Sequence, residues 1–262
     1  MEEKFVTVNR NKIRYLEEGD SDQNLILMHG LGGYAERWTN VMPHLSKKFH
    51  IFAPDLIGYG QSDKPSVDYT SEFFVKFVFD FIETLGIKKT YMIGTSLGGQ
   101  IVAECAATQS PIIEKIILIS PAGIMRKSTP TLDAYTMAAL YPTKESVKTA
   151  YQMMVGPGKQ VSEISIDRFV NNMSRPNAKM VFLSTLLGLK NAPDICEKLE
   201  KITIPVLLIW GKEDTLIPFE YSQQFISSIN NCEFIPLEGC GHSPYVEEPE
   251  KLSELVIRFL SK

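Results

Sequence analysis

The sequence predicts an α/β protein with a mostly parallel sheet that is covered by helices on both faces. One observation behind this prediction is a set of short apolar runs, typical of strands buried on both faces, at residues 25–28, 50–53, 91–93, 116–119 and 206–210. Another is a set of helical patterns that alternate with them, at residues 71–85, 97–108, 219–229 and 249–260. This alternation favours a parallel sheet, because parallel strands are joined by crossover connections that are usually helical.

The chain begins with a predicted hairpin, ahead of the parallel strands. Residues 4–9 and 12–17 alternate apolar and polar side chains around Asn9-Arg10-Asn11, which is the pattern of a half-buried pair of strands. The hairpin is therefore expected to add antiparallel strands to the sheet.

The alternation of predicted strands and helices is interrupted between residues 121 and 200. No buried strand is predicted there, and prolines at positions 130, 142, 157 and 176 interrupt the helix-like stretches. This span is too long for a plain loop between two strands. We therefore expect a helical cap at residues 121–200, inserted into an α/β core of residues 1–120 and 201–262.

Six of the ten methionines lie in the predicted cap. Methionine suits an adaptable apolar surface, so the cap methionines, Met153 and Met154 among them, are candidates to line a substrate site. Plain helix core is the alternative for these side chains.

Composition excludes several classes of protein. The 262 residues include 27 Lys and Arg against 31 Asp and Glu, a net charge of −4, and 44% are apolar. This balance excludes disorder and gives no electrostatic reason to expect nucleic acid or an anionic membrane as a partner. The four cysteines have neither metal-ligand spacing nor a disulfide framework, and no signal peptide or membrane span is recognised. We expect a cytoplasmic protein with a small-molecule substrate, and we leave open whether two copies of the chain form a homodimer.

A candidate nucleophile follows the apolar run at residues 91–93. The sequence Gly94-Thr95-Ser96-Leu97-Gly98 has the G-x-S-x-G pattern in the strand–turn–helix context that this pattern requires. Glycines are needed because larger residues would collide in so tight a turn. The turn exposes the Ser96 hydroxyl and directs at it the N-terminus of the next helix, which favours an oxyanion.

A serine hydroxyl needs a base, which in turn is oriented by an acid. Of the four histidines, His242 is the candidate base, because it lies in a glycine-flanked loop before the last helix. Asp214 is the candidate acid, because it follows the run at residues 206–210 and keeps the chain order serine, acid, histidine. Glu213 is the alternative acid.

A candidate oxyanion hole lies in the stretch from His29 to Gly33, HGLGG, directly after the run at residues 25–28. Glycines there allow the backbone to approach the nucleophile closely. We assign the hole to the backbone N–H groups of Leu31 and Leu97, which can meet the developing negative charge. The position of His29 in this loop indicates a structural role for it.

These motifs, together with residues 55–62 (DLIGYGQS), resemble those of the α/β-hydrolase family along nearly the whole chain. The resemblance implies an eight-stranded sheet, a triad of Ser96, Asp214 and His242, a cap over the site, and neither cofactor nor metal. The serine disfavours haloalkane dehalogenases and epoxide hydrolases, the members of this fold that carry an aspartate nucleophile.

Three functions stay open. Ser243 and Pro244, which follow the candidate base, resemble general esterases, and we expect a carboxylesterase-type serine hydrolase acting on small to medium apolar esters through an acyl-enzyme. The stretch around Arg168 resembles carbon–carbon hydrolases of meta-cleavage products, in which a cap arginine holds the substrate carboxylate. Those enzymes usually have tryptophan where this chain has Ser243 and asparagine where it has Thr95, and a solvated helix arginine is the alternative for Arg168. The third function is that of a non-catalytic small-molecule receptor with the same fold.

Overall fold

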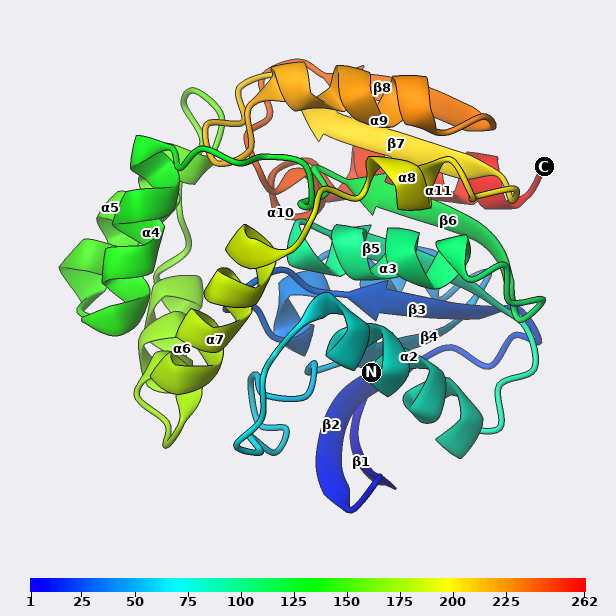
Figure 1. The fold of residues 1–262 in the computed structure, drawn as a ribbon, viewed down its shortest axis with the longest axis horizontal. Helices are drawn as coiled ribbons and strands as arrows, with labels where there is room; N and C mark the ends of the chain where they lie inside the picture. Colours follow the sequence, from blue (N-terminus) through cyan, green and yellow to red (C-terminus); the bar gives the residue numbers. More distant parts are fainter.

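The computed structural model describes residues 1–262 and has one eight-stranded sheet, in the order β1-β2-β4-β3-β5-β6-β7-β8 (Figure 1). The strands are β1 (Glu2–Val8), β2 (Asn11–Glu18), β3 (Asn24–Met28), β4 (His50–Pro54), β5 (Thr90–Thr95), β6 (Ile113–Ile119), β7 (Val206–Gly211) and β8 (Cys232–Leu237). β1 and β2 form the predicted antiparallel hairpin, β2 also pairs antiparallel with β4, and the strands from β4 to β8 run parallel. The predicted α/β-hydrolase fold is confirmed.

The central strands are buried on both faces, as their continuous apolar runs predict. In β3, Leu25 and Leu27 pack into the core on one face of the sheet, whereas Ile26 and Met28 pack into the core on the other face. The first face is covered by α1 (Met42–Leu45) and α11 (Pro249–Leu260), and the second by α2 (Ser71–Thr84), α3 (Leu97–Ala107), α8 (Cys196–Leu199) and α9 (Ser222–Ser228).

Local sequence explains where several helices begin. The hydroxyl of Thr70 accepts a hydrogen bond from the Phe73 amide at the start of α2, which satisfies a donor that the helix leaves free.

The predicted helix at residues 219–229 is divided in the structure. A short 3₁₀ turn, η2 (Phe219–Tyr221), comes first, and α9 then ends at Ser228.

Four helices lie beyond the carboxyl ends of the parallel strands (Figure 1), and we call them the cap helices. They are α4 (Pro130–Leu140), α5 (Lys144–Met154), α6 (Glu163–Met173) and α7 (Ala178–Asn191). No strand occurs within residues 121–200, as the sequence predicts. However, α8, which falls within that range, packs against α3 and α9 of the core, so the cap helices end with α7.

One aromatic residue from each cap helix contributes to a shared cluster. The ring of Tyr135 on α4 lies with its centroid 6.2 Å from Tyr151, 5.4 Å from Phe169 and 5.8 Å from Phe182. All four side chains are buried. Aromatic pairs at these separations stabilise the packing, so the cluster holds the cap helices together.

Candidate active site

Ser96 occupies a strained turn between β5 and α3. Its backbone φ of 53° and ψ of −120° are costly for a residue other than glycine, and strain of this kind is typical of functional sites. The turn can form only because its neighbours lack side chains. A Cβ atom on Gly94 would lie 2.2 Å from the carbonyl oxygen of Gly98, and one on Gly98 would lie 2.3 Å from that of Met28.

His242 and Asp214 form a buried pair at the ends of the strands. The Nδ1 atom of His242 lies 2.7 Å from Asp214 Oδ2, and the two side chains are 5% and 0% exposed. The other carboxylate oxygen of Asp214 accepts hydrogen bonds from the amides of Leu216 and Ile217, both at 2.9 Å. Because the carboxylate accepts at Nδ1, that nitrogen carries the proton and Nε2 is left to accept one. The structure thus brings Asp214, and not Glu213, to the imidazole.

The loop that carries His242 is held from both the core and the cap. The amide of His242 donates to the carbonyl oxygen of Met154, at the end of α5, at 2.7 Å. The carboxylate of Glu247 accepts from the amides of Gly156, Gly241 and Ser243 at 2.8, 2.9 and 3.1 Å. This carboxylate therefore joins the histidine loop to the chain that follows α5.

The amides of Leu31 and Leu97 lie beside the serine. Neither N–H donates a hydrogen bond within the protein, and both residues line the same cavity as Ser96. The loop after β3 passes very close to Ser96, since a Cβ atom on Gly30 would lie 3.1 Å from Ser96 Cβ. Two free amides at this place can stabilise negative charge on an oxygen bound there.

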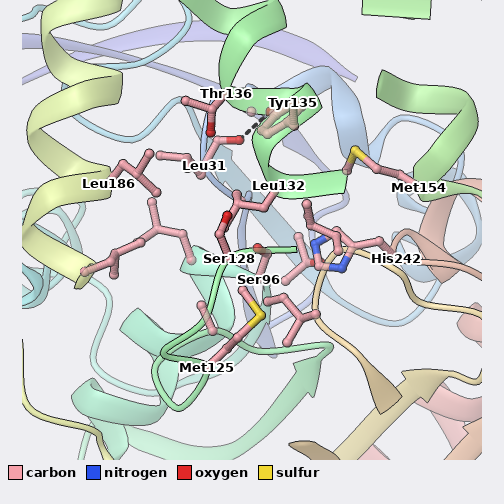
Figure 2. Close-up of a pocket in the computed structure, with 18 of the residues that line it drawn as sticks. Leu31, Ser96, Met125, Ser128, Leu132, Tyr135, Thr136, Met154, Leu186 and His242 are labelled. Atoms are coloured by element: carbon pink, nitrogen blue, oxygen red, sulfur yellow. Dashed lines mark hydrogen bonds between the residues drawn. The ribbon is translucent and has the colours of Figure 1, made fainter. Parts of the chain in front are cut away.

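A cap residue that the sequence analysis missed holds this loop. The hydroxyl of Tyr135 on α4 donates to the carbonyl oxygen of Leu31 at 2.7 Å, and Figure 2 shows this bond as a dashed line. Gly32 has a φ of 67°, and a Cβ atom there would lie 2.6 Å from that hydroxyl. No sequence signal could have indicated Tyr135, because the contact joins residues that are far apart in the chain.

His29 links two loops of the core and does not line the cavity. Its Nε2 accepts from the Leu56 amide at 3.0 Å, so Nδ1 carries the proton and donates to the Gly30 carbonyl at 2.8 Å. Burial lowers the pKa of His29, which favours this neutral form. These contacts agree with the structural role expected for it.

Ser96 and His242 face a cavity of about 370 Å³ between the core and the cap helices (Figure 2). This volume is within the usual range for small-molecule sites. The ring of His242 is hydrogen-bonded to Asp214 and not to Ser96. The larger apolar side chains of the lining come from both halves of the molecule and include Leu31, Leu97, Met125, Leu132, Met154, Leu186, Leu189, Leu216 and Ile217.

Two residues expected in the substrate site lie outside this cavity. Met154 lines it, but the neighbouring Met153 does not and is 36% exposed, because adjacent residues of α5 point to different sides. Arg168 is an exposed residue of α6 and also lies outside the lining. Instead, the cavity contains Arg37, which the sequence analysis missed although it lies four residues after the HGLGG stretch.

The structure has no group of three or more His, Cys, Asp and Glu side chains that could hold a metal ion. None of its helices combines the length and the apolar character needed to span a bilayer.

The chain belongs to the α/β-hydrolase fold family, whose profile matches residues 23–249. Its relatives include the 2-hydroxy-6-oxo-6-(2'-aminophenyl)hexa-2,4-dienoic acid hydrolase of Metapseudomonas resinovorans, which is 25% identical over 267 residues, 99% of this chain and 91% of that protein. The monoacylglycerol lipase ABHD6 of Homo sapiens is 26% identical over 253 residues, 91% of this chain and 75% of the lipase. Among solved structures, the meta-cleavage product hydrolase CumD of Pseudomonas fluorescens IP01 has the same fold, with a TM-score of 0.90 at 22% identity over 98% of this chain and 97% of CumD. The predicted family is therefore confirmed.

Proposed function

We propose that this protein is a serine hydrolase that cleaves carboxylic esters with small to medium apolar chains through an acyl-enzyme. The observation that carries the proposal is the arrangement around Ser96. Its strained turn lies beside two free amides and shares one cavity with the hydrogen-bonded pair of His242 and Asp214. This combination of nucleophile, base, orienting acid and oxyanion donors suits acyl transfer.

In the proposed mechanism, the Ser96 hydroxyl attacks the ester carbonyl while His242 Nε2 accepts its proton. Asp214 maintains the required tautomer and stabilises the imidazolium that forms. The oxyanion accepts hydrogen bonds from the amides of Leu31 and Leu97. His242 then donates its proton to the leaving alcohol, and water repeats the cycle on the acyl-enzyme.

Hydrolysis of p-nitrophenyl acetate and butyrate tests this proposal. We expect turnover by the wild-type protein and its loss in Ser96→Ala. Turnover that survives this substitution would contradict the assigned nucleophile. No turnover of either ester, together with binding of a small molecule, would favour a receptor.

Carbon–carbon bond hydrolysis is the second candidate, and the relative in Metapseudomonas resinovorans favours it. The same serine, histidine and aspartate could support that reaction. The departures at Thr95 and Ser243 remove two side chains usual in such enzymes, and Arg168 lies outside the cavity. We therefore expect negligible cleavage of a ring-fission dienoate, and efficient cleavage would reverse the order of the two candidates.

We also propose a cytoplasmic location. It rests on the sparse cysteines, Cys105, Cys196, Cys232 and Cys240, which are all free thiols. Cell fractionation with antibody detection would test it.

A further inference from the structure

Arg37 is a half-buried arginine without an acidic partner. It lies in the short 3₁₀ turn η1 (Ala35–Trp38) and lines the cavity that contains Ser96 and His242. Of its five guanidinium N–H donors, the structure pairs one, which donates from Nη2 to Ser243 Oγ at 3.3 Å. It forms no ion pair, although burying a cation without a counter-charge is costly.

The carboxylates near Arg37 are already satisfied by other groups. The adjacent Glu36 accepts two hydrogen bonds from Arg14, at 2.9 and 3.0 Å. Glu247, which lines a smaller recess beside Arg37, accepts from three backbone amides. Neither carboxylate is left to neutralise the guanidinium.

Aromatic rings keep Arg37 in place without neutralising it. Its guanidinium carbon lies 5.5 Å from the ring centroid of Tyr151 and 5.7 Å from that of Tyr245. Cation–π contacts of this kind compensate part of the desolvation of the cation and leave its in-plane N–H groups available. An arginine held this way is suited to a planar, bidentate acceptor such as a carboxylate.

The charged side chains that line the cavity are mostly cationic. Its lining includes four cationic side chains, Arg37, Arg126, Lys127 and Lys190, and one carboxylate, Asp133, which accepts from Ser128 Oγ at 2.5 Å. Arg126, Lys127 and Lys190 are exposed and form no ion pairs, so they can attract an anion toward the cavity. Residues 121–200 include 10 Lys and Arg against 7 Asp and Glu, whereas the rest of the chain has 17 against 24.

We propose that Arg37 binds a carboxylate of the substrate, so that the preferred substrates are esters with an apolar stem and one free carboxylate. This inference rests on the proposed ester hydrolysis and adds the charged group to it. Arg37 is then a specificity-determining residue on the core side of the cavity. The carboxylate belongs to either the acyl part or the alcohol part of the ester, and the experiment distinguishes the two.

Two matched pairs of esters test the proposal on the wild-type protein. Mono-p-nitrophenyl glutarate and p-nitrophenyl pentanoate share a leaving group and chain length and differ in the terminal carboxylate. 4-Carboxyphenyl butyrate and 4-carbamoylphenyl butyrate differ in the charge of the alcohol part. We expect kcat/KM at equal ionic strength to be at least about tenfold higher for the charged member of one pair. No preference in either pair would overturn the proposal.

Variants then assign the preference to Arg37. We expect Arg37→Met to lower the charged-to-neutral ratio of kcat/KM by about tenfold or more. Arg37→Lys keeps the positive charge but loses the planar guanidinium that can donate two parallel hydrogen bonds, so it should lower the ratio less. Arg168→Met, the same substitution outside the cavity, is the matched control and should keep the wild-type ratio. A ratio that is unchanged in Arg37→Met would also overturn the proposal.

A binding measurement separates this inference from the proposed ester hydrolysis. In Ser96→Ala, calorimetry should give a Kd for mono-p-nitrophenyl glutarate or 4-carboxyphenyl butyrate at least about tenfold below that of its neutral partner, and Arg37→Met in the same background should remove the difference. If the wild type cleaves no ester but this difference is present, ester hydrolysis is wrong and the carboxylate site stands. If neutral esters are cleaved and the difference is absent, the carboxylate site is wrong.

Discussion

The core side and the cap side of the cavity are built in different ways. On the core side, Ser96, Asp214 and His242 follow the ends of strands, where glycines and backbone hydrogen bonds determine their positions. On the cap side, Leu132 and Met154 project from separate helices that are joined by loops. The comparison indicates that the positions of the proposed reacting groups depend on backbone geometry, whereas the space for the apolar chain of a substrate depends on how the cap side chains pack.

The largest expected effects are on the core side. We expect Ser96→Ala and His242→Ala each to lower kcat for p-nitrophenyl butyrate by at least about 10⁴-fold, because the members of a triad act as a unit. Asp214→Asn should lower kcat by a somewhat smaller factor. Glu213→Gln is the matched control, since the hydrogen bond and ion pair of His242 are with Asp214 and not with Glu213. If it proved as damaging as Asp214→Asn, the assignment of the acid would be wrong.

A smaller effect is expected where the cap contacts the core. Tyr135→Phe removes the hydroxyl that holds the Leu31 carbonyl and leaves the aromatic cluster in place. One hydrogen bond contributes about 1 kcal/mol net, so we expect kcat to fall roughly five- to tenfold with little change in KM. Tyr69→Phe is the control, because the Tyr69 hydroxyl donates to the Pro65 carbonyl. Equal losses in both variants would contradict a positioning role for Tyr135.

Within the cap, neighbouring methionines should behave differently. Met154→Ala enlarges the cavity, so we expect activity on longer acyl chains to rise relative to activity on acetate. Met153→Ala, at the exposed neighbour, should leave the chain-length profile as it is. Rates measured across a series of p-nitrophenyl esters would check both, and identical profiles in the two variants would refute the difference between the two sides of α5.

The smallest effect is expected at Arg168, an exposed residue of α6. Arg168 lies outside the cavity, so Arg168→Ala should leave kcat/KM for p-nitrophenyl butyrate within about threefold of wild type. A threefold change corresponds to roughly 0.7 kcal/mol on the transition-state scale. A larger loss would mean that α6 contributes to the site in a way that its position does not indicate.

The same division explains what the sequence could predict. The proposed triad and oxyanion amides follow from local patterns, because a strand, a glycine turn and the next helix determine where Ser96 and Leu97 lie. The choice between Met153 and Met154 depends on the rotation of one helix, which a short stretch with two adjacent apolar residues does not define. Tyr135 and Arg37 depend on how the cap sits on the core, and no local pattern specifies that contact.

Under the proposed function, the hydrogen bond between Tyr135 and Leu31 would also couple enclosure of the substrate to its reactivity. The loop that carries the amide of Leu31, a proposed oxyanion donor, is held by a helix of the cap, so displacement of the cap from the core would release that loop. Under the proposed mechanism, acyl transfer would then be confined to the interval in which the substrate is enclosed. An ester on a carrier large enough to keep the cap from closing would then meet an incomplete oxyanion site, so under the proposed function the contact would select substrates by size, independently of affinity.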